Sequence, residues 1–493
     1  MKIITFLLFS FCLVLSAHGY DVTFTDASGL KYGYTSGNDT LTLLSGNGSG
    51  ITGDLVIPSH LSYNSKPYVV GAIDDRAFAG NKNLTSISIP SSVTSISHTA
   101  FYSCTGLKAI TVDAANKNYC SDASGVLYET TTDGVPVCLV TYPSASSATS
   151  YQILDGAVTI CSFSFYGVKD LKTLTIPSTV QCFGLFSNMN DALYMCPCLQ
   201  SITVADSSDY YCSVDGVLFD RDTTALITYP AAKSETSYVI PGTVTNVYSN
   251  AFTLASNLVS ITIPESVTRI GTSGTFPGCL SLTHFIVDGS NTHYTTEDGI
   301  LFNTAKTELV SYPAGKTATG YTVPSATVDA YAFCAATHLT SVTLPAAVTS
   351  IGNEAFYECM GLSEIHADNP QPVDISANGG TFDGVNLESC KLYVPAGSTE
   401  AYSNAEEWGD FTNIGEETAD AVTHPQGQQP SVSVASGRVT LSNMSKGEPL
   451  HIYDMTGKQV YSRNSISSEE EISLPHGAYV VKYGKASQKI MIP

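Results

Sequence analysis

A repeat of 23 residues is the feature that most constrains the fold of this chain. Phe78 and Phe101 are 23 residues apart, as are Phe333 and Phe356. The fullest copies of the repeat occupy residues 84–96, 171–180, 258–270 and 339–351. Each copy has two short runs of alternating apolar residues on either side of a proline turn, which predicts two β-strands per coil.

A longer period of 81 to 87 residues contains the short one. Its marker is the proline of the frame, at Pro90, Pro177, Pro264 and Pro345. Each long unit also contains a predicted hairpin, at 119–143, 211–230 and 294–313. Asp215-Gly216 and Asp298-Gly299 are pairs that supply positive φ in a tight hairpin turn, whereas the first copy has Ser124 before Gly125. The unit is therefore two coils plus one hairpin, repeated three times.

A single coil of this length cannot bury its apolar faces, so successive coils must stack. The sequence predicts a mainly β fold, a right-handed solenoid over residues 73–367 with parallel ladders and three protruding hairpins. We expect six phenylalanines to form an inward-pointing column: Phe78, Phe101, Phe165, Phe252, Phe333 and Phe356. The alternative, an aromatic box that binds a ligand, leaves the period unexplained.

The frame "AF", "C", "L", "IP", "SV" resembles the leucine-rich repeats of BspA-like bacterial surface proteins. The resemblance covers about 73–367, and segments within 20–72 look like the N-terminal coil of that family. It implies a leucine-rich-repeat fold and adhesion to host proteins, other bacteria or polysaccharide. The chain departs from the frame at 181–198, where we expect a bulge or an irregular loop.

Residues 368–416 are predicted to cap the open end of the solenoid, which would otherwise expose bare apolar surface. A short helix is expected near Ser398, whose side chain would cap the first free amides. Trp408, Tyr402 and Phe411 would close the core. A tryptophan that stacks on a sugar is the alternative for Trp408.

Beyond a polar, proline-containing linker at 417–430, residues 431–493 alternate apolar and polar positions, which predicts a small β-sandwich. This segment is similar to the C-terminal sorting domains of type IX secretion in Bacteroidetes, and it matches their pattern at Asp454, Gly457, Lys458, Gly477, Tyr479, Val481 and Lys489. The resemblance implies recognition by that secretion machinery. An ordinary terminal domain for binding or spacing is the alternative.

The first 19 residues predict export. Lys2 precedes an apolar run that ends in small residues, as in a signal peptide cleaved before Tyr20, and the run is too short for the alternative, a membrane anchor. No later stretch is apolar enough to span a membrane. The 22 Lys and Arg face 44 Asp and Glu, and this net charge of −22 argues against nucleic-acid partners and anionic lipid.

Twelve of the 13 cysteines lie beyond the signal peptide, where disulfides are possible. Cys104, Cys279 and Cys359 share one repeat phase, which favours core packing over disulfides or metal ligation. Cys196 and Cys198 are too close in sequence for an easy mutual bridge and lack the second pair that a zinc site needs.

The sequence contains no convergent catalytic motif, so we assign no catalytic, cofactor-binding or metal-ligating residue and expect no cofactor. Residues 206–216 offer carboxylates without calcium-loop spacing. The sequence indicates a non-enzymatic recognition or adhesion protein, secreted or on the cell surface in association with the outer membrane, whose partner is an extracellular protein or glycan. The alternative is an exported glycan-capturing or glycan-active protein, because a β-solenoid can hold two catalytic carboxylates that sequence spacing does not reveal.

Overall fold

The computed structural model describes residues 19–46, 50–184, 191–272, 274–417, 431–435, 438–442, 450–454, 458–463, 469–475, 477–483 and 486–492. The chain divides into two compact units, Met1–Glu416 and Glu417–Pro493. Except for Gly19 and Glu417, the predicted signal peptide and linker lie outside the described residues. Each unit is described separately below.

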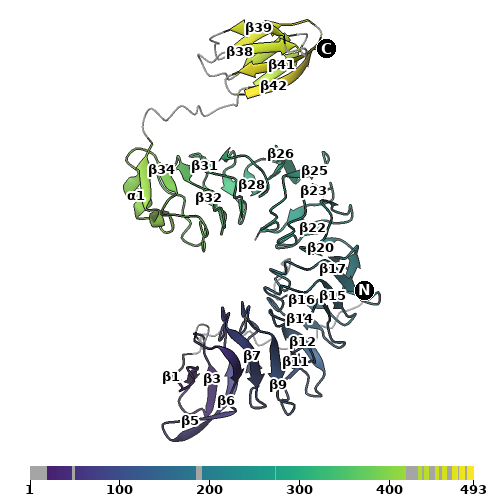
Figure 1. The fold of residues 1–493 in the computed structure, drawn as a ribbon, viewed down its shortest axis with the longest axis vertical. Coiled ribbons are helices and arrows are strands. Elements are labelled where there is room, and N and C mark those ends of the chain that lie inside the picture. Colours follow the sequence, from purple (N-terminus) through teal and green to yellow (C-terminus); the bar gives the residue numbers. More distant parts are fainter. Residues whose placement is uncertain are drawn as a thin grey trace, which may run out of the picture. The chain divides into compact units, whose positions relative to one another are not determined.

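The first unit is a β-solenoid of about 15 turns, with coils that stack in chain order from the purple to the green end of Figure 1. Each regular coil gives one strand to each of two parallel ladders. The long-strand ladder comprises β4 (Gly53–Val56), β7 (Leu84–Ile89), β9 (Ala109–Val112), β13 (Ser150–Gln152), β15 (Thr173–Ile176), β17 (Ser201–Val204), β21 (Ser237–Val239), β23 (Ser260–Ile263), β25 (His284–Val287), β29 (Gly320–Thr322), β31 (Ser341–Leu344), β33 (Glu364–Ala367), β34 (Lys391–Val394) and β35 (Asn413–Glu416).

The short-strand ladder lies on the other side of the proline turns. It comprises β8 (Ser95–Ile96), β12 (Pro136–Thr141), β14 (Thr159–Ile160), β16 (Cys182–Phe183), β20 (Ala225–Thr228), β22 (Asn246–Val247), β24 (Arg269–Ile270), β28 (Glu308–Ser311), β30 (Thr327–Val328) and β32 (Ser350–Ile351). The two strands per coil and the parallel pairing are therefore confirmed. At the N-terminal end, β8 pairs with β6 (Lys66–Ile73) in a sheet with β1 (Val22–Thr25), β2 (Lys31–Tyr34), β3 (Thr40–Leu43) and β5 (His60–Tyr63).

The three predicted hairpins are present, but they do not protrude. Each adds two strands before the short-strand ladder: β10 (Tyr119–Ser121) and β11 (Leu127–Thr130), β18 (Tyr211–Val214) and β19 (Val217–Asp220), β26 (Tyr294–Glu297) and β27 (Ile300–Asn303). The next strand in each case, β12, β20 or β28, pairs antiparallel with the hairpin and parallel with the following coil. The hairpins are thus built into the stack, and the expectation that they protrude is wrong.

Burial explains why the hairpins stay inside the solenoid. Leu127 belongs to the packed core on the N-terminal side, whereas its neighbours Val126 and Tyr128 belong to the next core. Leu218 and Phe219, in the second hairpin, face different cores in the same way. A strand with apolar residues in both phases is buried on both faces. Each hairpin therefore forms a wall between two successive cores.

Glycine sets the distance between each hairpin and the preceding coil. Asp215 and Gly216 have φ values of 50° and 78°, and Asp298 and Gly299 have 49° and 75°, as the sequence predicts for these turns. A Cβ on Gly299 would lie 2.5 Å from the Cβ of His284. The Gly299 carbonyl accepts a hydrogen bond from the Phe285 amide at 2.8 Å, so this close approach joins the hairpin to β25.

The aromatic column is confirmed, and tyrosines extend it. Phe78 stacks on Phe101 with centroids 5.7 Å apart, and Phe333 stacks on Phe356 at 4.9 Å. Tyr142, Tyr229 and Tyr312, from the turns that end the hairpins, stack on Phe165, Phe252 and Phe333 at 5.1, 5.3 and 5.2 Å. All of these rings are buried, so the column is core rather than a ligand box.

The C-terminal end of the solenoid is closed as expected. Helix α1 (Thr399–Ser403) and the 3-10 helix Trp408–Asp410 cover it. Trp408 is 1% exposed, packs against Phe382 at 5.0 Å and donates its indole N–H to the Val373 carbonyl at 2.9 Å. Burial excludes the sugar-stacking alternative for Trp408. Ser398 is the N-cap residue of α1, but its side chain makes no capping hydrogen bond because its backbone is helical rather than extended, so that expectation is wrong.

The second unit consists of two antiparallel sheets. One contains β36 (Ser431–Ala435), β37 (Arg438–Ser442) and β40 (Glu469–Ser473), and the other β38 (Leu450–Asp454), β39 (Gln459–Arg463), β41 (Gly477–Tyr483) and β42 (Ala486–Ile492). Val439, Leu450, Ile452, Ile472, Tyr479 and Val481 form its packed core. The Asp454 carboxylate accepts a hydrogen bond from the Lys458 amide at 3.1 Å, and Gly457 lies outside the described residues.

Candidate functional site

The turns that follow the short strands carry the most distinctive surface of the solenoid. The position two residues before the column aromatic has positive φ, although it is not glycine, in five turns: Arg76, Phe163, Asn250, Tyr331 and Glu354. Phe276 and Phe382 extend the column by stacking on Phe252 and Phe356. Two residues after the column aromatic, positive φ recurs at Gly80, Ser103, Gly167, Leu254, Gly278, Ala335, Glu358 and Gly384. Such conformations are costly for residues with a Cβ. Their recurrence at fixed positions shows that the coil geometry imposes them.

Aromatic side chains from these turns form a half-buried surface. Tyr102 lies 5.2 Å from Phe163 and 4.5 Å from Tyr166 between ring centroids, and Tyr166 lies 5.9 Å from Tyr194. The guanidinium of Arg76 sits 6.0 Å from the centroid of Tyr102. We call Tyr102, Phe163, Tyr166 and Tyr194 the aromatic patch. Tyr102 and Tyr166 come from turns that are not consecutive, because the turn that contains Tyr142 and Pro143 lies between them in the chain.

A second aromatic pair lies next to the patch. The rings of Tyr331 and Tyr357 are 6.3 Å apart. Burial raises the pKa of Tyr331 above its ordinary value, and a hydrogen bond with Glu354 adds to the shift. Burial also raises the pKa of Tyr194, and the charge of Glu354 raises it further, so this carboxylate lies near both groups. Both phenols are neutral at physiological pH, and the O–H of Tyr331 is already donated to Glu354.

A shallow polar hollow lies near the patch. It has a volume of about 310 Å³ and is lined by Tyr20, Lys31, Leu44, Ser45, Asp74, Asp75 and Arg76. Asp74 accepts the hydroxyl of Tyr20 at 3.1 Å, and Asp75 accepts the hydroxyl of Ser97 at 3.4 Å. Glycoside hydrolysis requires two carboxylates that face each other across the scissile bond. The carboxylates of Asp74 and Asp75 instead belong to adjacent residues of one turn.

The cysteines confirm the prediction of core packing at the shared repeat phase. The thiols of Cys104, Cys279 and Cys359 are buried and donate to the carbonyls of Phe78, Phe252 and Phe333 at 3.0, 3.1 and 2.9 Å. Burial raises the pKa of Cys104 and Cys279 to about 12. These thiols are therefore unreactive at neutral pH.

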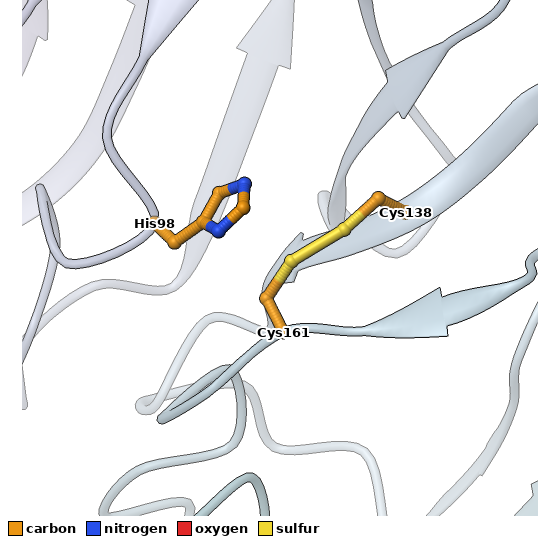
Figure 2. A group of neighbouring side chains, drawn as sticks. All are labelled: His98, Cys138 and Cys161. Carbon is orange, nitrogen blue, oxygen red and sulfur yellow. A yellow bond between two sulfur atoms is a disulfide. The ribbon is translucent and has the colours of Figure 1, made fainter. Parts of the chain in front are cut away.

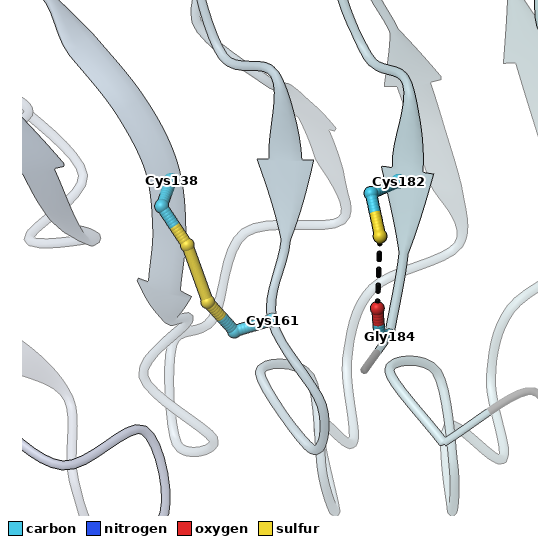
Figure 3. The surroundings of a disulfide bond; sticks show 4 residues. All are labelled: Cys138, Cys161, Cys182 and Gly184. Carbon is cyan, nitrogen blue, oxygen red and sulfur yellow. Dashed lines mark hydrogen bonds between the residues drawn. A yellow bond between two sulfur atoms is a disulfide. The ribbon is translucent and has the colours of Figure 1, made fainter. Parts of the chain in front are cut away.

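One disulfide is present among the described cysteines, between Cys138 in β12 and Cys161 just after β14, and Figure 3 shows it bridging neighbouring strands. Cys182 on the next strand has a free thiol that donates to the Gly184 carbonyl at 3.1 Å. Cys196 and Cys198 are also free, as the sequence suggested. His98 points toward the bridge (Figure 2). Its imidazole and the two sulfurs form the one group of three potential metal ligands in the described part of the chain, which leaves residues 206–216 without such a group.

The repeats match the family described as the BspA type leucine-rich repeat region, in six copies over residues 61–123, 141–214, 230–320 and 326–406. These ranges cover more than half of the chain. The chain belongs to this family. A search of curated proteins finds no match.

Solved structures of other leucine-rich repeat proteins are similar to this BspA-type chain. A leucine-rich cell surface protein from Faecalibacterium prausnitzii is 23% identical, with 83% of this chain and 99% of that one covered and a TM-score of 0.34. The pneumococcal vaccine antigen PcpA is 18% identical, with coverages of 80% and 99% and a TM-score of 0.38. A leucine-rich repeat protein from Bacteroides ovatus is 17% identical, with coverages of 81% and 100% and a TM-score of 0.28.

Sequence reasoning assigned no ligand-binding residue in these BspA-type repeats, and the aromatic patch was missed. The available signal was the residue after each column phenylalanine, which is tyrosine in "AFYSC", "SFYGV" and "AFYEC". The cluster of His98 with the disulfide was also missed, because Cys138 and Cys161 are one coil apart and His98 belongs to an earlier coil. Within the described residues, no helix has the length and apolarity that crossing a membrane requires.

Proposed function

We propose that this protein is a non-enzymatic recognition protein that presents the turns of its repeats to an extracellular protein or glycan. The observation that carries the proposal is the aromatic patch, in which the rings of Tyr102, Phe163, Tyr166 and Tyr194 contact one another and remain partly exposed. Membership in a leucine-rich repeat family supports a scaffold for binding.

The chemistry of the patch suits large partners. Tyrosine offers an apolar face and a hydroxyl, loses little conformational freedom on binding, and is enriched in energetically important positions of interfaces. Arg76 beside Tyr102 adds a cation at the edge of the patch. The hollow lined partly by Arg76 has the size of a small subsite, so one ligand can contact both features.

Binding on a glycan array and to extracellular host proteins, with the chain from Tyr20 to Pro493, tests this proposal. Tyr166→Ser and Tyr194→Ser change the patch, and Tyr210→Ser, which alters a tyrosine that is 44% exposed elsewhere, is the matched control. We expect patch variants to lose at least about tenfold in affinity for a ligand that Tyr210→Ser still binds. Equal loss in all three variants would contradict the patch as the binding site.

The same glycans test the alternative function, that of an exported protein that captures or cleaves glycan. Release of reducing ends by the wild type, abolished by Asp74→Asn or Asp75→Asn, would identify an enzyme. We propose no catalytic activity, because the carboxylates that line the hollow are adjacent and already accept hydrogen bonds.

We further propose that the protein is exported and held at or released from the cell surface, with association to an outer membrane and delivery by type IX secretion. The signal-peptide pattern of 1–19 and the sorting-like pattern of 431–493 support this. In the second unit, Tyr479 of that pattern is buried and donates to the Pro475 carbonyl at 2.9 Å, and Val481 is buried in the core. These residues build a compact unit that a secretion machinery can recognise.

A further inference from the structure

His98, Cys138 and Cys161 converge at the boundary between the N-terminal coils and the first hairpin unit. His98 follows β8, Cys138 lies in β12 and Cys161 follows β14. One ligand atom of each residue lies within 4.8 Å of the other two. Figure 2 shows the imidazole directed toward the two sulfurs from a separate segment of chain. Three groups that bind soft metal ions therefore meet in one place.

We propose that His98, Cys138 and Cys161 form a binding site for one thiophilic d¹⁰ cation, Zn²⁺ being the probe, whenever the disulfide is reduced. The disulfide and the metal complex use the same two sulfurs, so the oxidised chain does not bind the ion. Reduction takes two electrons and two protons from an external dithiol, which becomes a disulfide. Binding of the cation then releases two protons as both thiols become thiolates.

The donor set determines the class of ion. One imidazole nitrogen and two thiolates favour Zn²⁺ or Cu⁺ over Mg²⁺ and Ca²⁺, which prefer oxygen ligands. Tetrahedral Zn²⁺ with bonds of about 2.3 Å to sulfur places two thiolates about 3.8 Å apart. The Cα atoms of Cys138 and Cys161 are 6.7 Å apart, so rotation of the two side chains suffices to move the sulfurs from the bridge to this spacing. A water molecule would complete the tetrahedron.

The surroundings favour a bound cation. Cys138 is 4% and Cys161 0% exposed, and two buried thiolates require a positive partner. Glu129 in β11 pairs with Cys138 in β12 across the antiparallel ladder, so both side chains lie on the same face of the sheet. This places an acidic residue next to one ligand. His98 is only partly buried, which leaves the ion a route from solvent.

Comparison with the other repeat units shows that the fold does not require these cysteines. The register that pairs Cys138 with Thr159 pairs Ala225 with Asn246 and Glu308 with Thr327. The residue that corresponds to Cys161 is Tyr248 in the second unit and Asp329 in the third. The cysteine pair beside a histidine is thus specific to the first unit.

The test compares Zn²⁺ binding by the purified chain before and after reduction with a dithiol that is then removed under anaerobic conditions. We expect the reduced chain to bind one more equivalent of Zn²⁺ than the oxidised chain, which has the same sequence and needs no mutation to serve as a control. With Co²⁺ in place of Zn²⁺, reduction should produce sulfur-to-cobalt charge-transfer absorption. His98→Gln should weaken Zn²⁺ binding by at least about tenfold.

Variants locate the ion. Cys138→Ser together with Cys161→Ser should abolish the additional equivalent, whereas Cys182→Ser, which removes the free thiol on the next strand, should retain it. Circular dichroism checks that each variant is folded. If a variant unfolds, the comparison of the oxidised with the reduced wild-type chain still tests the proposal. Equal Zn²⁺ stoichiometry in both redox states overturns the proposal. So does an additional equivalent that persists without Cys138 and Cys161, or wild-type affinity in His98→Gln.

Discussion

Cys161 of the first repeat unit and Asp329 of the third occupy the same position in the coil, each directly after a two-residue strand that pairs with the last strand of a hairpin. Their neighbours across the ladder also correspond, because Cys138 aligns with Thr159 as Glu308 aligns with Thr327. In the first unit a disulfide joins the side chains of Cys138 and Cys161. In the third unit the corresponding residues are the acids Glu308 and Asp329, and the charge of Glu308 raises the pKa of Asp329.

Asp329 should make stability depend on pH. Burial raises its pKa from 3.8 to about 7, and Glu308 adds to this rise. Because the folded chain then holds a proton that the unfolded chain has lost, this group's contribution to stability falls as pH rises from about 4 to 7. Asp329→Asn cannot ionise, and its amide oxygen can still accept the Ala330 amide hydrogen bond of 2.8 Å. We expect it to raise the melting temperature at pH 8 and to have little effect at pH 4.

Asp374→Asn is a control of opposite sign for that measurement. Hydrogen bonds from Ser376 lower the pKa of this exposed carboxylate. The carboxylate therefore stabilises the folded chain at pH values above its pKa in the unfolded chain, and this stabilisation is lost as the pH falls. The two variants should therefore shift the melting temperature in opposite directions at pH 8. A shift for Asp329→Asn that is the same at pH 4 and pH 8 would show that its carboxyl titrates normally.

Phe333→Ala should destabilise the solenoid by about 3–5 kcal/mol, because a buried ring is lost and a cavity remains. Phe333 stacks between Tyr312 and Phe356 in the column. Met360→Ala, at a side chain that is 61% exposed, is the control and should change stability by less than about 0.5 kcal/mol. Urea denaturation followed by far-ultraviolet circular dichroism measures both, and similar midpoints for the two variants would place the column outside the core.

Gly299→Ala should weaken the junction between a hairpin and the coil before it. The new Cβ would contact His284 at 2.5 Å and would also hold alanine at a φ of 75°. Both effects are unfavourable, and together they should cost more than about 1 kcal/mol. Gly320→Ala, where a Cβ meets nothing within 4 Å, should be nearly neutral. Thermal denaturation of the pair gives the answer, and equal melting temperatures would refute the steric requirement.

Deletion of residues 431–493 should leave the solenoid folded and prevent its delivery to the surface. Trp408, Tyr402 and Phe411 already cover the last coil, so the melting temperature of the remaining chain should be unchanged. Cell fractionation in the native host, with Tyr479→Ala as a second variant that alters the core of the terminal unit, measures export. Surface levels equal to those of the full-length chain would show that the terminal unit is a binding or spacer domain.

The repetitive part of the fold could be predicted from sequence because each feature recurs. The proline turns, the phenylalanine column and the Asp-Gly hairpin turns appear in several copies, and each copy has the same physical role in the structure. The wall formed by the hairpins had a signal as well. "GVLY", "GVLF" and "GILF" contain three consecutive apolar residues, which indicates burial on both faces rather than a protruding hairpin.

The candidate sites could not be predicted in the same way, because each occurs once. The contact between Tyr102 and Tyr166 joins two turns that are not consecutive in the chain, and the group of His98, Cys138 and Cys161 depends on how three coils stack. Neither follows from sequence spacing. The side-chain cap expected from Ser398 failed for a local reason, since its φ of −100° and ψ of −6° place it in the helical region.

The walls between the cores determine how the solenoid comes apart. Among the described strands, both ladders are interrupted where each hairpin begins. At the first interruption the Ile110 amide donates to the Gly125 carbonyl and the Ala145 amide donates to the Leu107 carbonyl, and these bonds join the two sides. Each wall nevertheless contributes side chains to two cores, as Leu127 and Tyr128 do in the first wall. Under a stretching force, length should therefore be released one whole unit at a time, with each event exposing one face of the next wall and lowering the resistance of its neighbour.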